Sequence, residues 1–358
     1  MSELSCEDCG FALLRGKMFI KFSLNQWNYD NSNPSREHQM SRLIAEQSDV
    51  LPVEPMSKIA LFFIPLEGIS AELQTQAMAW LSEDERAKVA RYRDPKAQMN
   101  ALLVRAALRV VLSTVLPHIG SASAQPFHPQ DWCFEYGPKG KPSLTVSQWQ
   151  QTGLDFNLSH SGDWLLIGVV KAQNARPVLF GVDIERSRPK TDIYPILNHY
   201  FSPQETSSLL ALKGEASQRQ RFFDLWALKE SYIKATGLGL AQSLKSFAFD
   251  LAAVDLAQNS HFNLSVSPDL LGQVEFKPIE IQGGSALNVS PHFPLFGNIP
   301  VLQLGSPNAH QWQVYFGRLN EEYRFALSLA VNDSTHLTLN KLALSMQMLS
   351  IDTLLSGI

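Results

Sequence analysis

The stretch GVDIERSRP, residues 181–189, places two carboxylates inside an otherwise apolar strand pattern. Successive side chains of a strand point to opposite faces, so we expect Val182 and Ile184 to face one way and Asp183 and Glu185 the other. With a rise of about 3.3 Å per residue, the Cα atoms of Asp183 and Glu185 would lie about 6–7 Å apart, near enough for both carboxylates to reach one cation. On this fragment alone, a half-exposed strand with a solvated acidic face is the simpler interpretation, and a metal site is the alternative.

Composition places the chain among globular proteins. Its 358 residues are 45% hydrophobic, which is enough for two domains or one large core. The 30 basic and 34 acidic residues give a formal net charge of −4, which favours neither nucleic acid nor an anionic membrane as a partner. Residues 1–10 lack the pattern of a signal peptide, and the three cysteines are a poor disulfide framework, so we expect a cytoplasmic protein.

The order of patterns predicts two halves. Residues 1–57 are polar and are interpreted as an N-terminal extension. We expect the first half at 58–165 and the second at 166–332, with an insertion near 265–310 and a C-terminal tail at 333–358.

Periodicity predicts the individual elements. The expected strands are residues 58–66, 156–170, 177–185, 246–251, 312–319 and 325–331. The expected helices are residues 72–92, 101–116, 203–212 and 222–236. Ser202, Pro203 and Glu205 form a capping-box pattern, and Gly237 is suited to end the last helix.

A third carboxylate lies on the predicted helix 222–236. Trp226, Glu230 and Lys234 are spaced four residues apart and lie along one ridge. A glutamate four residues before a lysine is usually a surface pair worth a few tenths of a kcal/mol. Together with Asp183 and Glu185, however, Glu230 could complete an oxygen-ligand set for Mg²⁺, with the lysine facing a bound phosphate.

These segments carry a family resemblance. The chain resembles the Sfp-type 4′-phosphopantetheinyl transferases, whose GVDIE-like strand and W-x-x-K-E-x-x-x-K helix correspond to residues 181–185 and 226–234. Three further segments agree in order, namely residues 91–109, GPKGKP at 137–142 and FNLSHSG at 156–162. The resemblance implies an α+β fold with a pseudo-two-fold arrangement of two similar α/β halves. Each half would be a small antiparallel sheet packed on helices, with the active site between them.

The resemblance also implies a chemistry. Coenzyme A would bind between the halves, and a serine of an apo acyl carrier or peptidyl carrier protein domain would attack its β-phosphorus and release 3′,5′-ADP. The implied Mg²⁺ ligands are Asp183, Glu185 and Glu230; Glu230 is also the favoured base, and Lys234 would stabilise charge on the phosphates. The implied coenzyme A contacts are Lys141, Ser159 and His160. Family members of this type are usually monomeric.

One position departs from the family. Where an arginine usually helps to bind the 3′-phosphate of coenzyme A, this chain has Asn100. Either a nearby cation, with Lys88, Lys96 and Lys141 as candidates, replaces the missing charge, or the 3′-phosphate is held less tightly.

Two other functions remain open at this stage. A Mg²⁺-dependent phosphohydrolase of coenzyme A or nucleotides could use the same carboxylates to activate water. A non-catalytic module that binds coenzyme A or a carrier protein would need no intact set of carboxylates.

Overall fold

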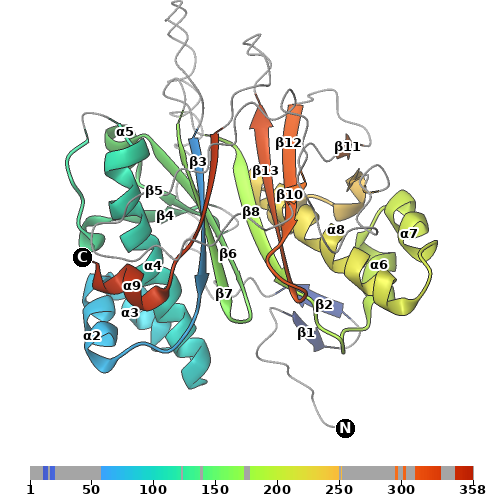
Figure 1. Cartoon of the computed structure of the whole chain (residues 1–358), viewed down its shortest axis with the longest axis horizontal. Coiled ribbons are helices and arrows are strands. Elements are labelled where there is room, and N and C mark those ends of the chain that lie inside the picture. The colour runs from blue at the N-terminus through green and yellow to red at the C-terminus, as the bar shows by residue number, and fades with distance from the viewer. Residues whose placement is uncertain are drawn as a thin grey trace, which may run out of the picture.

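Two four-stranded sheets pack face to face, and helices cover the outer face of each, which gives four layers in the order α/β/β/α (Figure 1). The computed structural model describes residues 11–14, 17–20, 58–121, 124–137, 140–172, 178–249, 251, 295–296, 301–303, 311–331 and 343–357. This mixed α+β architecture of small sheets and helices confirms the predicted fold class at that level.

The first sheet has the strand order β14-β3-β7-β6. Its strands are β3 (Lys58–Pro65), β6 (Leu154–Ser161), β7 (Trp164–Lys171) and β14 (Ala343–Met348). The helices packed on its outer face are α2 (Ala71–Trp80), α4 (Pro95–Ile119) and α9 (Ile351–Ser356), and α3 (Glu83–Val89) connects α2 to α4. Because β14 runs parallel to β3, the expectation of a purely antiparallel sheet is wrong for this half.

The second sheet has the strand order β10-β12-β13-β8 and is antiparallel throughout. Its strands are β8 (Phe180–Arg186), β10 (Leu295–Phe296), β12 (Gln311–Arg318) and β13 (Tyr323–Val331). The helices on its outer side are α6 (Ile193–Tyr200), α7 (Pro203–Leu210) and α8 (Glu215–Thr236). Ser202 and Glu205 form the predicted capping box, and Gly237, at a φ of 70°, ends α8 as expected.

Smaller elements join these layers. Three two-stranded sheets pair β1 (Phe11–Leu14) with β2 (Lys17–Ile20), β4 (Phe134–Tyr136) with β5 (Pro142–Leu144), and β9 (Phe247–Phe249) with β11 (Val301–Gln303). The short helices are α5 (Val146–Thr152), η1 (Pro129–Asp131), η2 (Gly239–Ala241) and η3 (Leu244–Ser246).

The core between the sheets follows from strand alternation. Ile59, Leu61 and Phe63 of β3 face the second sheet, whereas Ala60, Phe62 and Ile64 face the helices of the first half. On the opposite sheet Phe180, Val182 and Ile184 of β8 face inward. A Cβ atom at Gly168 would lie 2.9 Å from Val182 Cγ1, so glycine at this position lets the two sheets approach closely.

Helix α4 is the buried helix predicted at 101–116, extended at both ends. Asp94 caps its N-terminus and Pro95 occupies its first turn. Within the described part of the chain, α4 is the one helix long and apolar enough to cross a membrane, but 78% of its most apolar window is buried inside the protein. Its apolar character is therefore accounted for by packing in the core of the first half.

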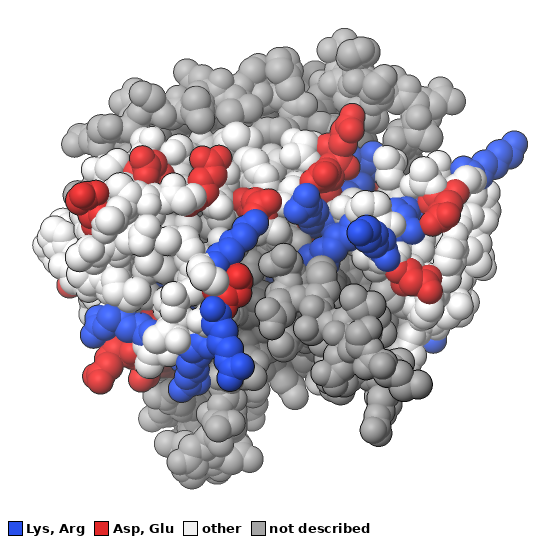
Figure 2. Space-filling model, turned by 90° about the horizontal axis from the view of Figure 1, so that it is seen from below, with Lys and Arg blue, Asp and Glu red and all other residues white. Residues whose placement is uncertain are grey.

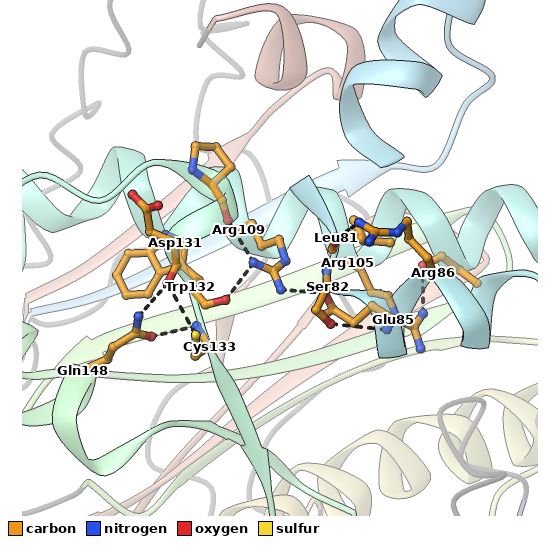
Figure 3. A network of polar contacts seen from close by, with 12 residues as sticks. Leu81, Ser82, Glu85, Arg86, Arg105, Arg109, Asp131, Trp132, Cys133 and Gln148 are labelled. Atoms are coloured by element: carbon orange, nitrogen blue, oxygen red, sulfur yellow. Dashed lines mark hydrogen bonds and ion pairs between the residues drawn. The ribbon is translucent and has the colours of Figure 1, made fainter. Parts of the chain in front are cut away.

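A buried ion pair fixes α4 against α3 and η1 (Figure 3). Arg109 Nη2 lies 2.5 Å from Glu85 Oε2, and Arg109 Nη1 donates to the carbonyls of Pro129 and Trp132 at 2.9 and 2.8 Å. Arg109 thus has a structural role. The other arginine of α4, Arg105, instead acts through its charge on His160 of β6.

Further sequence predictions differ from the structure, and one is the single helix expected at 72–92, which forms α2 and α3. Residues 156–170 form two strands, because Gly162, at a φ of 56°, reverses the chain between β6 and β7. Both strands belong to the first sheet, so the change to the second sheet comes after Lys171 and not at 165/166. Residues 343–357, assigned to a C-terminal tail, add β14 and α9 to the first half. Most of 1–57 and of 265–310 lies outside the described residues.

Candidate active site

Strand β8 presents its carboxylates to helix α8, as its alternation predicts. Val182 and Ile184 are buried between the sheets, and Asp183 and Glu185 point to the other face. A Cβ atom at Gly181 would lie 2.2 Å from the carbonyl oxygen of Ser231, so only glycine allows α8 to pack this closely on β8. This contact brings Glu230 and Lys234 beside the two strand carboxylates.

Each of the three carboxylates has a buried oxygen without a hydrogen-bond partner. These oxygens are Asp183 Oδ2, Glu185 Oε1 and Glu230 Oε1. The exposed fractions of the three residues are only 3%, 8% and 6%, respectively. Lys234 Nζ lies 2.6 Å from Asp183 Oδ1, and Arg188 Nη1 lies 3.7 Å from Glu185 Oε1. Buried polar oxygens are rarely left unpaired in proteins, so three together indicate a site built for a ligand.

The electrostatics of the cluster are consistent with its geometry. Burial, reinforced by the charges of Asp183 and Glu185 and opposed by Lys234, raises the pKa of Glu230 to about 8. Burial raises the pKa of Glu185 to about 7, against the opposing charge of Arg188. The pKa of Asp183 is also raised by burial, although Lys234 and Ser159 oppose the shift. The protein alone therefore stabilises these groups poorly as anions.

The residues fit a hard divalent cation by donor type. Carboxylate oxygens are the ligands that Mg²⁺ prefers, and the three unpartnered oxygens here are of that type. Within the residues that the structure describes, no group of three or more Asp, Glu, His or Cys side chains is already arranged to hold a metal ion. Lys234 instead supplies the positive charge at Asp183.

One face of β6 lines the free edge of β8. Asp155 Oδ2 accepts a hydrogen bond from Val178 N at 2.9 Å, and Asn157 Oδ1 accepts one from Val182 N at 2.9 Å. On the same face the Ser159 hydroxyl donates to Asp183 Oδ1 at 2.7 Å. Sequence reasoning missed Asn157, although its spacing of two residues from Ser159 in FNLSHSG was the available signal.

Ser161 continues this face. Its hydroxyl oxygen accepts a hydrogen bond from Arg186 N at 3.2 Å and lies 3.4 Å from Glu185 Oε2. Ser159 and Ser161 therefore each contact one of the two strand carboxylates.

The other predicted contacts lie around this cluster. His160 projects from the opposite face of β6, and burial followed by the charges of Lys234 and Arg105 lowers its pKa to about 4. Lys141 donates to the backbone carbonyl oxygens of Lys234, at 2.7 Å, and Phe180, at 3.4 Å. The Lys141 ammonium thus contacts backbone of the second half.

Lys88 lies further into the first half. Its ammonium is 5.1 Å from the centroid of the Tyr136 ring, and burial lowers its pKa to about 8. Tyr136 also lines a pocket between α4 and the β4–β5 hairpin, together with Arg105 and Pro142 of the GKP segment. The full lining comprises Glu85, Val104, Arg105, Leu108, Phe134, Tyr136, Pro142 and Leu158. Arg105 is only 7% exposed and is a cation that the sequence reasoning about Asn100 did not weigh.

Lys96, another candidate to replace the missing arginine, belongs to a surface ion network. Lys96 Nζ lies 2.8 Å from Asp163 Oδ1, and Arg186 lies 3.8 Å from Asp163 Oδ2 and 3.0 Å from Glu322 Oε2. Basic and acidic side chains are interspersed on the face seen in Figure 2. Exposed pairs of this kind contribute little stability, but the nearby carboxylate makes Lys96 a weaker candidate for a phosphate contact.

Comparison with known proteins shows similarity to one enzyme family. A model of the 4′-phosphopantetheinyl transferase superfamily matches residues 179–287. A putative 4′-phosphopantetheinyl transferase of Synechocystis sp. is 33% identical over 201 residues, which cover 54% of this chain and 75% of that protein. The 4′-phosphopantetheinyl transferase Sfp of Bacillus subtilis is 31% identical over 228 residues, which cover 64% of this chain and 89% of that protein. The 4′-phosphopantetheinyl transferase HetI of Nostoc sp. is 34% identical over 185 residues, which cover 52% of this chain and 71% of that protein.

Proposed function

This chain belongs to the 4′-phosphopantetheinyl transferase superfamily, and from that premise we propose that it transfers the 4′-phosphopantetheine arm of coenzyme A to a serine of an apo acyl carrier or peptidyl carrier protein domain. The observation that carries the proposal is the cluster of three buried carboxylates with unpartnered oxygens beside Lys234. A site that binds a pyrophosphate through a cation typically combines oxygen ligands for the cation with a lysine that faces the phosphates.

Asp183, Glu185 and Glu230 would hold Mg²⁺. When bound, the ion would neutralise charge on the pyrophosphate of coenzyme A. Its binding would also supply contacts for the three carboxylate oxygens that have no hydrogen-bond partner.

Glu230 is the proposed general base. The serine hydroxyl of the carrier gives its proton to this carboxylate as the serine oxygen bonds to the β-phosphorus, and the bond from phosphorus to the leaving 3′,5′-ADP breaks. Lys234, whose ammonium lies 2.6 Å from Asp183 Oδ1, would stabilise the negative charge that develops on the leaving group.

Coenzyme A is proposed to bind where the two halves meet, with Ser159, His160 and Lys88 as contacts. The pocket lined by Arg105 and Tyr136 adjoins these residues, and Arg105 is a further candidate to face the 3′-phosphate. We regard the halves as related by a pseudo-two-fold axis, because each is a four-stranded sheet backed by helices, and we expect a monomer.

Mass spectrometry tests the proposal. An apo acyl carrier protein incubated with the enzyme, coenzyme A and Mg²⁺ is expected to gain one phosphopantetheine per acceptor serine. Asp183→Asn should abolish this gain. Asp155→Asn is the matched control, because Asp155 is a neighbouring aspartate outside the three-carboxylate cluster and accepts a hydrogen bond from Val178 N, which asparagine can still do.

The other two functions give different results in the same experiment. Loss of coenzyme A without any change in the carrier mass would indicate the phosphohydrolase. An unchanged carrier and unchanged coenzyme A, across several acyl and peptidyl carrier domains, would leave only a binding module.

A further inference from the structure

Lys141 reaches from the first half into the second. It lies in the turn between β4 and β5, directly after Gly140, which has a φ of 79°. Its ammonium donates to the carbonyl oxygen of Lys234 at 2.7 Å and to that of Phe180 at 3.4 Å. One side chain of the first half thus contacts both the last turn of α8 and the first residue of β8.

The Lys234 carbonyl needs such a partner. The last four carbonyls of an α-helix have no acceptor role within the helix, and Lys234 is in the last turn of α8, which ends at Thr236. A cation at a helix C-terminus also interacts favourably with the helix dipole. A Cβ atom at Gly237 would lie 4.0 Å from Lys141 Cδ, so the lysine stem passes directly beside the residue that ends the helix.

The contacts of Lys141 and Lys234 link the two elements that carry the candidate site. Lys234 is held by Lys141 at its backbone and contacts Asp183 through its side chain at 2.6 Å. Asp183 lies three residues after Phe180, whose carbonyl oxygen accepts a hydrogen bond from Lys141. Moving the ammonium of Lys141 would therefore release both backbones that present the Lys234–Asp183 pair.

We propose that Lys141 is a positioning residue, which fixes the backbones of Lys234 and Phe180 and so places the Lys234 ammonium against Asp183, in place of the phosphate contact that the family resemblance implies for it. The proposal rests on the proposed function of the site. An ammonium has three donors, and two are already directed at carbonyl oxygens. Burial also lowers the pKa of Lys141 to about 8, with the Lys234 charge adding to that shift against Asp155, as expected for a cation placed away from bulk water.

Steady-state kinetics separates the two roles. Lys141→Met keeps the length of the stem and removes the donors. If Lys141 positions Lys234, kcat should fall by about tenfold or more while the KM for coenzyme A changes less than about twofold, because an interaction that acts only on transition-state geometry is lost. The preference for coenzyme A over 3′-dephospho-coenzyme A should not change. Lys171→Met, at the exposed end of β7, is the control and should match the wild type.

Two results would overturn the proposal. One is a KM for coenzyme A that rises by about tenfold with kcat unchanged, or a loss of the preference for the 3′-phosphate, since either marks a direct ligand contact. The other is wild-type kinetics throughout. Lys141→Arg keeps a cationic donor and should recover most of kcat; if the methionine variant does not fold, a partial loss of kcat at constant KM in the arginine variant carries the same conclusion.

Hydrogen exchange makes the test independent of transferase activity. In the ligand-free protein, the Gly237 amide donates to the Ile233 carbonyl in the last turn of α8. Lys141→Met should speed exchange of this amide and its neighbours by about tenfold relative to Lys171→Met, because the end of the helix loses its anchor. Unchanged exchange would refute the positioning role even if the wild type transfers nothing, whereas faster exchange with an inactive wild type would reject the proposed function alone.

Discussion

Glu230 and Glu205 are both buried glutamates near α8, and the same substitution should change stability in opposite directions. Glu230 has an oxygen without a partner and lies beside two other carboxylates. Glu205 accepts from Ser202 N and Phe249 N at 3.0 Å each and lies 2.8 Å from the ammonium of Lys229, which is itself fully buried. Glu230→Gln should stabilise the metal-free protein, and Glu205→Gln should destabilise it.

The magnitude for Glu230 follows from its pKa. Folding raises that pKa from 4.5 to about 8, so the folded state binds more protons and the free energy of unfolding falls as pH rises between these two values. At about 1.4 kcal/mol for each pH unit above 4.5, ionising Glu230 at pH 7 costs the folded state about 3–4 kcal/mol. The cost is only about 1 kcal/mol at pH 5.5. Glutamine does not ionise in either state and avoids this cost.

Loss of the Glu205 charge has the opposite consequence. Glutamine would leave the Lys229 ammonium buried without an anionic partner, with the neutral Leu244 and Phe247 carbonyls at 2.7 and 2.9 Å. Breaking a buried ion pair by removing one partner costs about 3–5 kcal/mol.

Urea unfolding with a chelator present measures both variants against the wild type at the two pH values. Added Mg²⁺ should then stabilise the wild type and stabilise Glu230→Gln less, because the variant lacks one proposed ligand. A Glu230→Gln variant that is less stable than the wild type at pH 7 without metal, or a gain that does not grow with pH, would refute the account of the carboxylate cluster.

Two further predictions concern the coenzyme A contacts. Asn100→Arg should lower the KM for coenzyme A by up to about tenfold, because a charge-assisted contact is worth about 1.5–3 kcal/mol against about 1 for a neutral one; an equal decrease with 3′-dephospho-coenzyme A would show that the 3′-phosphate is not involved. The His160 ring should remain neutral down to about pH 5 in the ligand-free protein, because its pKa is lowered from 6.5 to about 4. Its contribution to the free energy of unfolding is therefore present above pH 6.5 and is lost as pH falls through about 4. Titration of the ring by NMR, assigned with His160→Gln, tests this, and a midpoint near 6.5 would contradict it.

Local signals explain which parts of the fold the sequence predicts. The capping box at Ser202 and Glu205 and the left-handed Gly237 depend on a few neighbouring residues, and both are confirmed. The single strand expected at 156–170 is wrong because period-two alternation does not distinguish one long strand from a hairpin. A strand of that length would span about 50 Å, so its length was the clue to a turn at Gly162.

Long-range contacts explain the parts that the sequence does not predict. Strands β14 and β3 pair although most of the chain separates them in sequence, and no local feature of residues 343–348 indicates β3 as the partner. In the candidate site, the strand period predicts that Asp183 and Glu185 share a face, and the structure confirms it. The roles of Asn157 and Lys141 depend on which backbone lies opposite them, so neither follows from local sequence.

The alternation of β6 connects the two parts of the candidate site. On one face, Asn157 accepts a hydrogen bond from Val182 N at the edge of β8, and Ser159 and Ser161 contact the carboxylates of β8. Leu158 on the other face lines the pocket of the first half. A shift of β6 by one residue would exchange these faces and remove both sets of contacts at once.

The turn that ends β6 therefore matters to the site. Gly162 needs its φ of 56°, and a Cβ atom there would lie 2.3 Å from the Tyr323 hydroxyl, which itself accepts a hydrogen bond from Asp163 N at 3.1 Å. Tyr323 begins β13, the strand that pairs with β8. The glycine after the serines thus fixes the register of β6 against the second sheet, and this register brings Ser159 to Asp183 and Ser161 to Glu185.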